Sequence, residues 1–233
     1  MKRLYVIGDS WCVNEWPELL ANELNYKLIN DSISGSSNDW IFRRLIEWVS
    51  CQENTDDLFV IVGLTSPHRR EEHFNNYHPG GDGFTNEIDR FIYEKLYDNE
   101  LAHLQTISYI LAIQEFLKSK KINYLLYDSW YDILQCEEEL ILNRKSTDKK
   151  KKFNFDRFLF HQVYSIEETQ QKGPYYTNEL NIGKMIEKID LNYYLIPDTD
   201  SLRIQMETET GHPYYDDCVR MKNRLLERIV KYE

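Results

Sequence analysis

The sequence has no long apolar run and no excess of positive charge, and each absence excludes a class of protein. Its longest apolar stretches, residues 58–64 and 122–127, fall far below the ~18 residues that a bilayer span requires. The apolar run that follows Lys2 and Arg3 ends at Gly8, so we expect neither a secretory signal nor a membrane anchor. The 28 basic and 39 acidic residues give a net charge of −11. This sign argues against a nucleic-acid partner and against attraction to an anionic membrane.

Cysteines and cofactor motifs are also scarce. The four cysteines are scattered, without a Cys-x-x-Cys pair or a histidine at zinc-finger spacing, which is typical of reduced thiols in a cytoplasmic protein. A virion component would have the same properties. A Walker motif and a G-x-G-x-x-G motif are both missing, which argues against a nucleotide-binding domain. His68, His73 and His78 lack the i, i+4 spacing of a helical metal pair, so we expect no metal and no cofactor.

Aromatic residues are abundant by contrast. The 233 residues include 17 Tyr, 10 Phe and 5 Trp, and 42% are hydrophobic, which is ample material for a buried core. At about 150 residues per domain, this length favours a single domain over residues 1–233.

Short β-branched and aromatic runs alternate with helical patterns along the chain. Strands are predicted at 4–7, 26–30, 58–63, 122–127 and 193–196, and helices at 17–24, 38–50 with Asn38 as N-cap, 99–119, 178–189 and 213–232. Alternation of this kind predicts an α/β fold, a three-layer α/β/α sandwich with a central, mostly parallel sheet. Two longer segments, at about 65–97 and 143–178, interrupt it as excursions. Functional side chains are expected in the loops at the carboxyl ends of the strands.

The loop after the first predicted strand contains a candidate nucleophile. Gly8-Asp9-Ser10 places a serine hydroxyl at the end of a buried strand, a position from which it can attack a substrate. A serine needs a base, and the strongest candidate is His212, just before the terminal helix. Glu209 lies three residues upstream and can orient the imidazole. Ser10 can also be read as a turn serine that caps the next helix, and Asp9 as a structural residue that bonds loop amides.

These short blocks resemble the SGNH hydrolases, also called GDSL-type esterases and lipases. Gly8-Asp9-Ser10 is similar to the first block with its nucleophile, and Gly35 in Ser34-Gly35-Ser36 is similar to the glycine of the second block. The resemblance implies a flavodoxin-like SGNH fold, a serine nucleophile at Ser10 and an oxyanion hole that contains the amides of Ser10 and Gly35. His212-Pro213 is similar to the last block and implies a catalytic His212.

Two blocks depart from the family pattern. The third block is normally Gly-x-Asn, and here it reads Gly63-Leu64-Thr65, so that the hydroxyl of Thr65 replaces an amide donor of the oxyanion hole. Losing one such donor slows a serine hydrolase without abolishing its activity. In the last block Glu209 stands where the family has aspartate, and glutamate can still orient an imidazole.

Four further side chains near these blocks are candidates for substrate binding: Trp11, Asn38, Arg69 and Trp130. Trp11 can form a wall beside the nucleophile, and Arg69 can place a cation near the oxyanion or an anionic group of the substrate. Trp130 can stack on a sugar, although packing in the core explains it as well.

The sequence therefore predicts an esterase that removes a short acyl group, such as acetyl, from a carbohydrate or another small polar ester. Acyl transfer to a sugar hydroxyl would use the same residues. The alternative is a catalytically weak or inactive SGNH-like domain that binds carbohydrate or has a structural role. Thr65 and Glu209, the two departures from the family pattern, motivate that alternative.

Overall fold

The centre of the structure is a parallel five-stranded sheet. The structure, a computed structural model, describes residues 1–67, 69–72, 75–77, 99–129, 185–195 and 215–230. The strands of the sheet are β1 (Arg3–Ile7), β2 (Lys27–Asn30), β3 (Leu58–Leu64), β6 (Asn123–Asp128) and β7 (Tyr194–Leu195), in the order β2-β1-β3-β6-β7. Every pairing between them is parallel. The predicted fold class and parallel sheet are confirmed.

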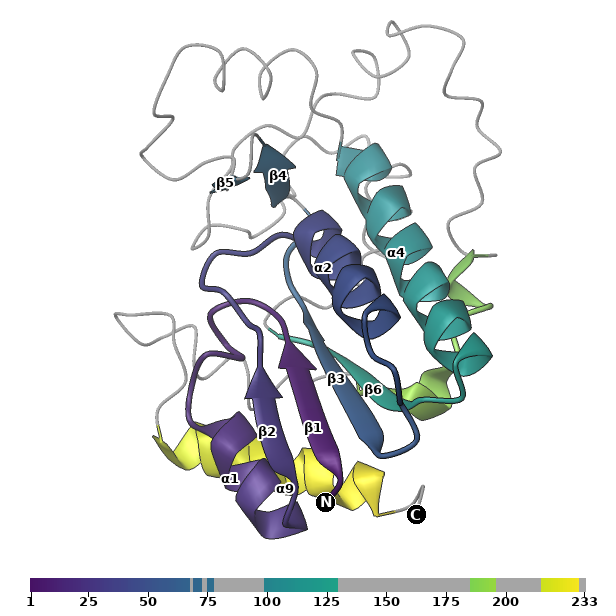
Figure 1. Cartoon of the computed structure of the whole chain (residues 1–233). Helices are drawn as coiled ribbons and strands as arrows, with labels where there is room; N and C mark the ends of the chain where they lie inside the picture. Colours follow the sequence, from purple (N-terminus) through teal and green to yellow (C-terminus); the bar gives the residue numbers. More distant parts are fainter. Residues whose placement is uncertain (68, 73–74, 78–98, 130–184, 196–214, 231–233) are drawn as a thin grey trace, which may run out of the picture.

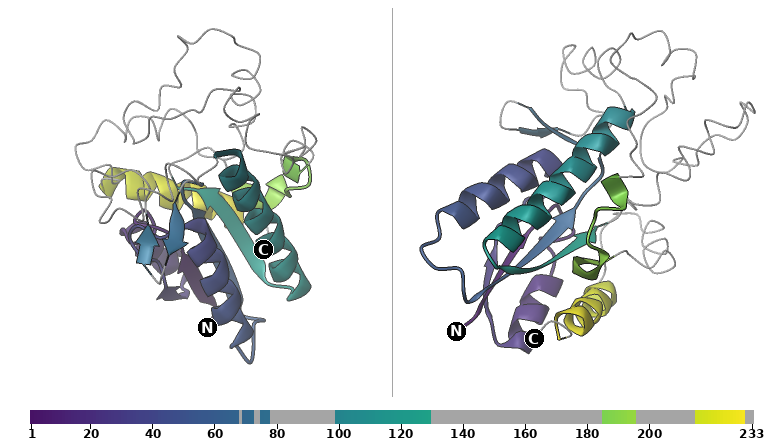
Figure 2. Two further views of the ribbon diagram at one scale, coloured as in Figure 1. Left: turned by 90° about the horizontal axis from the view of Figure 1, so that it is seen from above. Right: turned by 90° about the vertical axis from the view of Figure 1, so that its right-hand side faces the viewer.

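Helices cover both faces of this sheet (Figures 1 and 2). Helices α2 (Asn38–Ser50) and α4 (Asn99–Ser119) lie on one face, and α1 (Trp16–Leu24) and α9 (Tyr215–Ile229) lie on the other. A short 3-10 helix, η1 (Leu191–Tyr193), leads into β7. None of the described helices is long and apolar enough to cross a membrane.

Strand register divides the core into two halves. Tyr5 pairs with Val60, and Val60 pairs with Tyr124, so these three side chains point to the α2 and α4 face, where they are buried. On each strand, the residues directly before and after these three point to the opposite face. There Leu4 and Phe59 pack with the apolar sides of α1 and α9. All seven residues of β3 are buried, as expected for a central strand covered on both faces.

The helix boundaries follow ordinary end signals. Pro17 is in the first turn of α1, and Asn25 ends that helix in a left-handed conformation, with φ of 54°. Asn38 was predicted to be the N-cap of the next helix, but Ser37 takes that position in extended conformation, and Asn38 is the first helical residue. The boundaries of α4 match the predicted helix.

The later elements differ more from prediction. Of the predicted helix 178–189 the structure describes residues 185–189, in which the helix ends at Ile186 and a turn follows. The terminal helix α9 spans Tyr215–Ile229, and residues 213, 214, 231 and 232 of its predicted range lie outside the described residues. In the predicted strand 193–196, Tyr194–Leu195 form β7, Tyr193 belongs to η1, and residue 196 lies outside the described residues. In the first predicted excursion, β4 (Arg70–Glu72) and β5 (Asn75–Tyr77) form an antiparallel pair. The second excursion, 143–178, lies outside the described residues.

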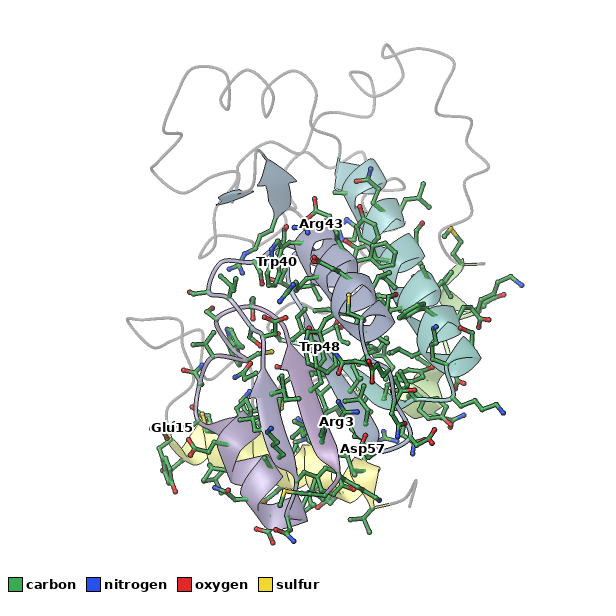
Figure 3. All side chains as sticks on the ribbon, viewed as in Figure 1. Arg3, Glu15, Trp40, Arg43, Trp48 and Asp57 are labelled. Carbon is green, nitrogen blue, oxygen red and sulfur yellow. The ribbon has the colours of Figure 1, made fainter. Side chains whose placement is uncertain are left out.

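The amino and carboxyl ends of the strands carry different side chains. At the amino ends of the strands, Arg3 donates to Asp57 at 2.6 Å, an ion pair that joins the start of β1 to the residue before β3 (Figure 3). Trp40 lies near the carboxyl ends of the strands, in the first turn of α2 (Figure 3). The loops at these carboxyl ends carry the predicted site.

Candidate active site

Two strand ends frame the site. From β1 the chain runs outward to β2 and then crosses back to β3 on the other side of β1. In parallel α/β sheets this reversal opens a crevice between the carboxyl ends of the two central strands, and ligands bind there. Asp9 and Ser10 follow β1, and Thr65 and Ser66 follow β3, so polar residues line both sides of the switch point.

The turn that carries Ser10 is held by Asp9. The Asp9 carbonyl accepts the amide hydrogen of Cys12 at 3.0 Å, and carboxylate Oδ1 of Asp9 accepts that of Trp11 at 3.0 Å. Asn14 closes the turn by donating to the Ser10 carbonyl at 3.0 Å. Asp9 is fully buried and Ser10 is 9% exposed. These bonds agree with the structural role predicted for Asp9, and they fix Ser10 in an irregular turn that ends before α1 begins.

The loop that contains Gly35 is attached to the same strand end. The Gly8 carbonyl accepts the amide hydrogen of Ile33 at 3.1 Å and the hydroxyl hydrogen of Ser36 at 2.8 Å. Gly35 has φ of +81°, a conformation that residues with a side chain rarely adopt. Among the described residues, apart from its two neighbours in sequence, no heavy atom lies within 4 Å of a Cβ built on it. The loop therefore places a partly exposed backbone beside the Ser10 turn.

Asn38 joins this second loop to the end of β3. Its carbonyl Oδ1 accepts the Thr65 amide hydrogen at 2.9 Å, and its Nδ2 donates to the Thr65 carbonyl at 2.8 Å. Nδ2 also lies 3.4 Å from the hydroxyl of Thr106 on α4. Asn38 is 2% exposed, so its carboxamide acts as a buried bridge between two loops.

Asp9 is also the centre of a buried ion pair. Its Oδ2 accepts the Thr65 hydroxyl at 2.9 Å and Nη1 of Arg69 at 3.0 Å. The Arg69 side chain is 10% exposed, and burial lowers its pKa, an effect that the charge of Asp9 opposes. Nη1 also lies 3.4 Å from the Ser36 carbonyl. Because the Thr65 hydroxyl donates to Asp9, it would have to give up this bond before it could donate to an oxyanion.

Cys12 fills the space below the turn. Its Sγ lies 2.8 Å from the Tyr127 hydroxyl, and both residues are buried. A Cβ on Gly8 would meet this sulfur at 2.2 Å, and one on Gly63 would meet it at 2.4 Å. Glycine is required at both strand ends because the cysteine side chain occupies the space of a Cβ.

A second buried carboxylate lies further along the sheet. Asp128 ends β6 with no exposed surface and accepts a hydrogen bond from the hydroxyl of Tyr194 on β7. Ser129, which follows it, donates its amide hydrogen to the Leu64 carbonyl at 2.8 Å. The sequence shows Asp128 only as part of a polar turn, and no local pattern marks Tyr194 as its partner.

The structure brings together six of the nine predicted site residues: Ser10, Trp11, Gly35, Asn38, Thr65 and Arg69. Trp11 is only 7% exposed, and its carbonyl accepts the indole hydrogen of Trp16 at 2.8 Å. The predicted base and its partner, His212 and Glu209, lie outside the described residues, as does Trp130. The side chains of the histidine-rich segment also lie outside this part of the chain.

The chain matches no protein-family model and no curated protein. Among solved structures it is similar to the psychrotrophic esterase EstA from Pseudoalteromonas sp., in a structure inhibited by monoethylphosphonate. The identity is 12% and the TM-score 0.49, over 100% of this chain and 98% of that one.

Two further solved structures cover about half of the chain. One is a protein assigned to the lipolytic G-D-S-L family from Desulfitobacterium hafniense DCB-2, with 16% identity and a TM-score of 0.35 over 55% of this chain and 59% of that one. The other is the acetyl xylan esterase AlAXEase, with 15% identity and a TM-score of 0.32 over 53% and 57%. The chain thus spans less than two thirds of the length of both.

Proposed function

We propose that this protein is a serine ester hydrolase with Ser10 as its nucleophile. The observation that carries the proposal is the position of Ser10. It lies at the carboxyl end of β1, at the switch point of a parallel sheet, in a turn fixed by a buried carboxylate and beside a loop with a positive-φ glycine. This combination supports the proposal, because acyl transfer requires a serine hydroxyl together with backbone amides that bind the oxyanion.

In the proposed mechanism, Ser10 Oγ attacks the acyl carbonyl while His212 accepts the hydroxyl proton. The carbonyl π electrons move to the oxygen, and the amides of Ser10 and Gly35 bind the resulting oxyanion. The intermediate collapses, the bond to the leaving alcohol breaks, and His212 returns the proton to that alcohol. Water then repeats the sequence on the acyl-enzyme. Glu209 orients the imidazole throughout.

The proposed substrate is a short acyl ester of a carbohydrate or a small polyol. The polar residues at the two strand ends, among them Thr65 and Ser66 after β3, favour a polar substrate over a long lipid chain. Acyl transfer to a sugar hydroxyl would differ only in the group that resolves the acyl-enzyme. No nucleic acid, metal or cofactor enters this proposal.

The test is turnover of p-nitrophenyl esters with acetyl, butyryl and octanoyl groups by wild type, Ser10→Ala and Ser129→Ala. We expect kcat/KM to be highest for acetyl and to fall by at least about 10³-fold in Ser10→Ala, the scale of losing a nucleophile. Ser129 is also a buried serine at a strand end, and its substitution should leave turnover unchanged. Equal rates in wild type and Ser10→Ala would contradict the proposal.

A second candidate function is carbohydrate binding without catalysis. The observation in its favour is that Thr65, in the position of the family asparagine, donates its hydroxyl hydrogen to Asp9. In that case a folded wild type would hydrolyse none of the three esters. Xylo- and gluco-oligosaccharides would then bind wild type and Ser10→Ala equally in calorimetry.

A further inference from the structure

The residue before the proposed nucleophile carries a buried carboxylate. The carboxylate of Asp9 is adjacent to Ser10 in sequence and has no exposed surface. Two charges of the same sign repel each other more strongly in a buried site than in water. An uncompensated Asp9 would therefore oppose the negative charge that forms on the acyl oxygen.

The effect of Asp9 on nearby acidic groups is visible in the structure. Burial raises the pKa of the Cys12 thiol, and the charge of Asp9 raises it further. The pKa of Tyr127 is also raised, first by burial and then by contributions from Cys12 and from the charge of Asp9. Burial is the larger cause of both shifts, and the charge of Asp9 adds to each.

Arg69 provides the opposite charge at hydrogen-bonding distance. Its Nη1 lies 3.0 Å from Oδ2 of Asp9, and the side chain is 10% exposed. A guanidinium stays protonated even when burial lowers its pKa. The same nitrogen lies 3.4 Å from the Ser36 carbonyl, next to Gly35. One side chain from the loop after β3 thus contacts the two loops that carry the proposed oxyanion-hole amides.

We propose that Arg69 is a positioning residue for ester hydrolysis: it acts through Asp9, whose buried negative charge it neutralises next to the Ser10 turn and the Gly35 loop. This inference rests on the proposed function. The guanidinium does not touch the substrate; it allows two backbone amides to stabilise an oxyanion beside a buried carboxylate.

The test replaces each partner of the Arg69–Asp9 ion pair in turn. Arg69→Met removes the guanidinium that faces Asp9, whereas Asp9→Asn removes the negative charge and keeps the shape of the side chain. We expect kcat for p-nitrophenyl acetate to fall by about 100-fold in Arg69→Met, the scale of one lost oxyanion-hole donor. KM should stay within about threefold, and Asp9→Asn should keep kcat within about tenfold of wild type.

A purely structural ion pair predicts a different result, because both single variants remove the same bond. Equal losses of kcat in Arg69→Met and Asp9→Asn would overturn the inference. The double variant Asp9→Asn/Arg69→Met has no net charge at the pair and should recover at least about tenfold over Arg69→Met. Recovery of less than about twofold would also overturn it. If Arg69→Met fails to fold, Arg69→Gln replaces it, since glutamine keeps a donor toward Asp9 without the charge.

The matched control is Arg3→Met, which removes the Arg3–Asp57 ion pair at the amino ends of the strands. It should leave kcat within about twofold of wild type. Wild type and Ser10→Ala, measured in the same assay, distinguish a failure of the proposed ester hydrolysis from a failure of the proposed role of Arg69. Equal turnover of these two would overturn the proposed function together with this inference. An active wild type with equal losses in Arg69→Met and Asp9→Asn would overturn the inference alone.

Discussion

Replacing Asn38 by leucine should destabilise the protein substantially, because its carboxamide satisfies both backbone groups of Thr65. The Thr65 amide and carbonyl bond Asn38 at 2.9 and 2.8 Å, and Thr65 has no exposed surface. Leucine has the same branching at Cγ and is larger, but it has no polar atoms, so both hydrogen bonds to Thr65 would be lost. Each unsatisfied group costs about 1–3 kcal/mol, which gives a loss of about 2–6 kcal/mol in the free energy of unfolding.

The assay is urea denaturation followed by the fluorescence of the five tryptophans. Asn38→Asp should lose at least as much as Asn38→Leu, because a carboxylate oxygen would replace the Nδ2 donor and face the Thr65 carbonyl. Asn22, on the exposed surface of α1, provides the control: Asn22→Leu should change stability by less than about 0.5 kcal/mol.

The same variants separate a structural role of Asn38 from the substrate-binding role that the sequence suggested. A residue that only binds substrate would give Asn38→Leu with wild-type stability and a raised KM. That result would refute the conclusion that Asn38 stabilises the fold through its two hydrogen bonds to Thr65. The bridge predicts loss of stability in the absence of any substrate.

The packing below the turn gives two more predictions. Gly63→Ala should lower the free energy of unfolding by about 1–3 kcal/mol through overpacking, because the new Cβ would lie 2.4 Å from Cys12 Sγ and 2.7 Å from the Tyr127 hydroxyl. In urea denaturation, the double variant Gly63→Ala/Cys12→Ala should lose less stability than the sum of the two single variants. Additive losses would contradict the steric explanation. Stability should also fall at alkaline pH, because burial holds the Cys12 pKa well above its ordinary 9.0 and the unfolded chain therefore binds fewer protons than the folded one above that pH. Between pH 8 and 10 wild type should lose about 1.4 kcal/mol more than Cys12→Ala. Parallel stability profiles of the two proteins would show that Cys12 titrates normally.

Much of the fold could be predicted from the sequence because its signals are local. The uninterrupted apolar run of β3 marks a buried strand, and the spacing of apolar residues in 99–119 marks α4 with both of its ends. Short elements such as β7 carry too few residues for a pattern, so their boundaries were less accurate. The order of the strands depends on packing between distant segments and leaves no local trace.

The site divides in the same way. The position of Ser10 after β1 and the structural role of Asp9 followed from residues close together in sequence. Asn38 was read as a helix cap because its sequence neighbours suggest one, whereas its partner Thr65 is 27 residues away. Arg69 was a candidate cation for substrate, and its bond to Asp9 spans 60 residues. Such contacts are fixed by the topology of the sheet, which a single sequence does not specify.

The central claim, that Ser10 is an activated nucleophile, can be tested without knowing the substrate. Wild type, Ser10→Ala and Ser129→Ala would be incubated with a fluorophosphonate probe, and the intact mass of each would be measured. The account predicts one covalent adduct on wild type and on Ser129→Ala, located at residue 10 by peptide mapping, and none on Ser10→Ala. A folded wild type that takes up no probe, or equal labelling of Ser10→Ala, would contradict it.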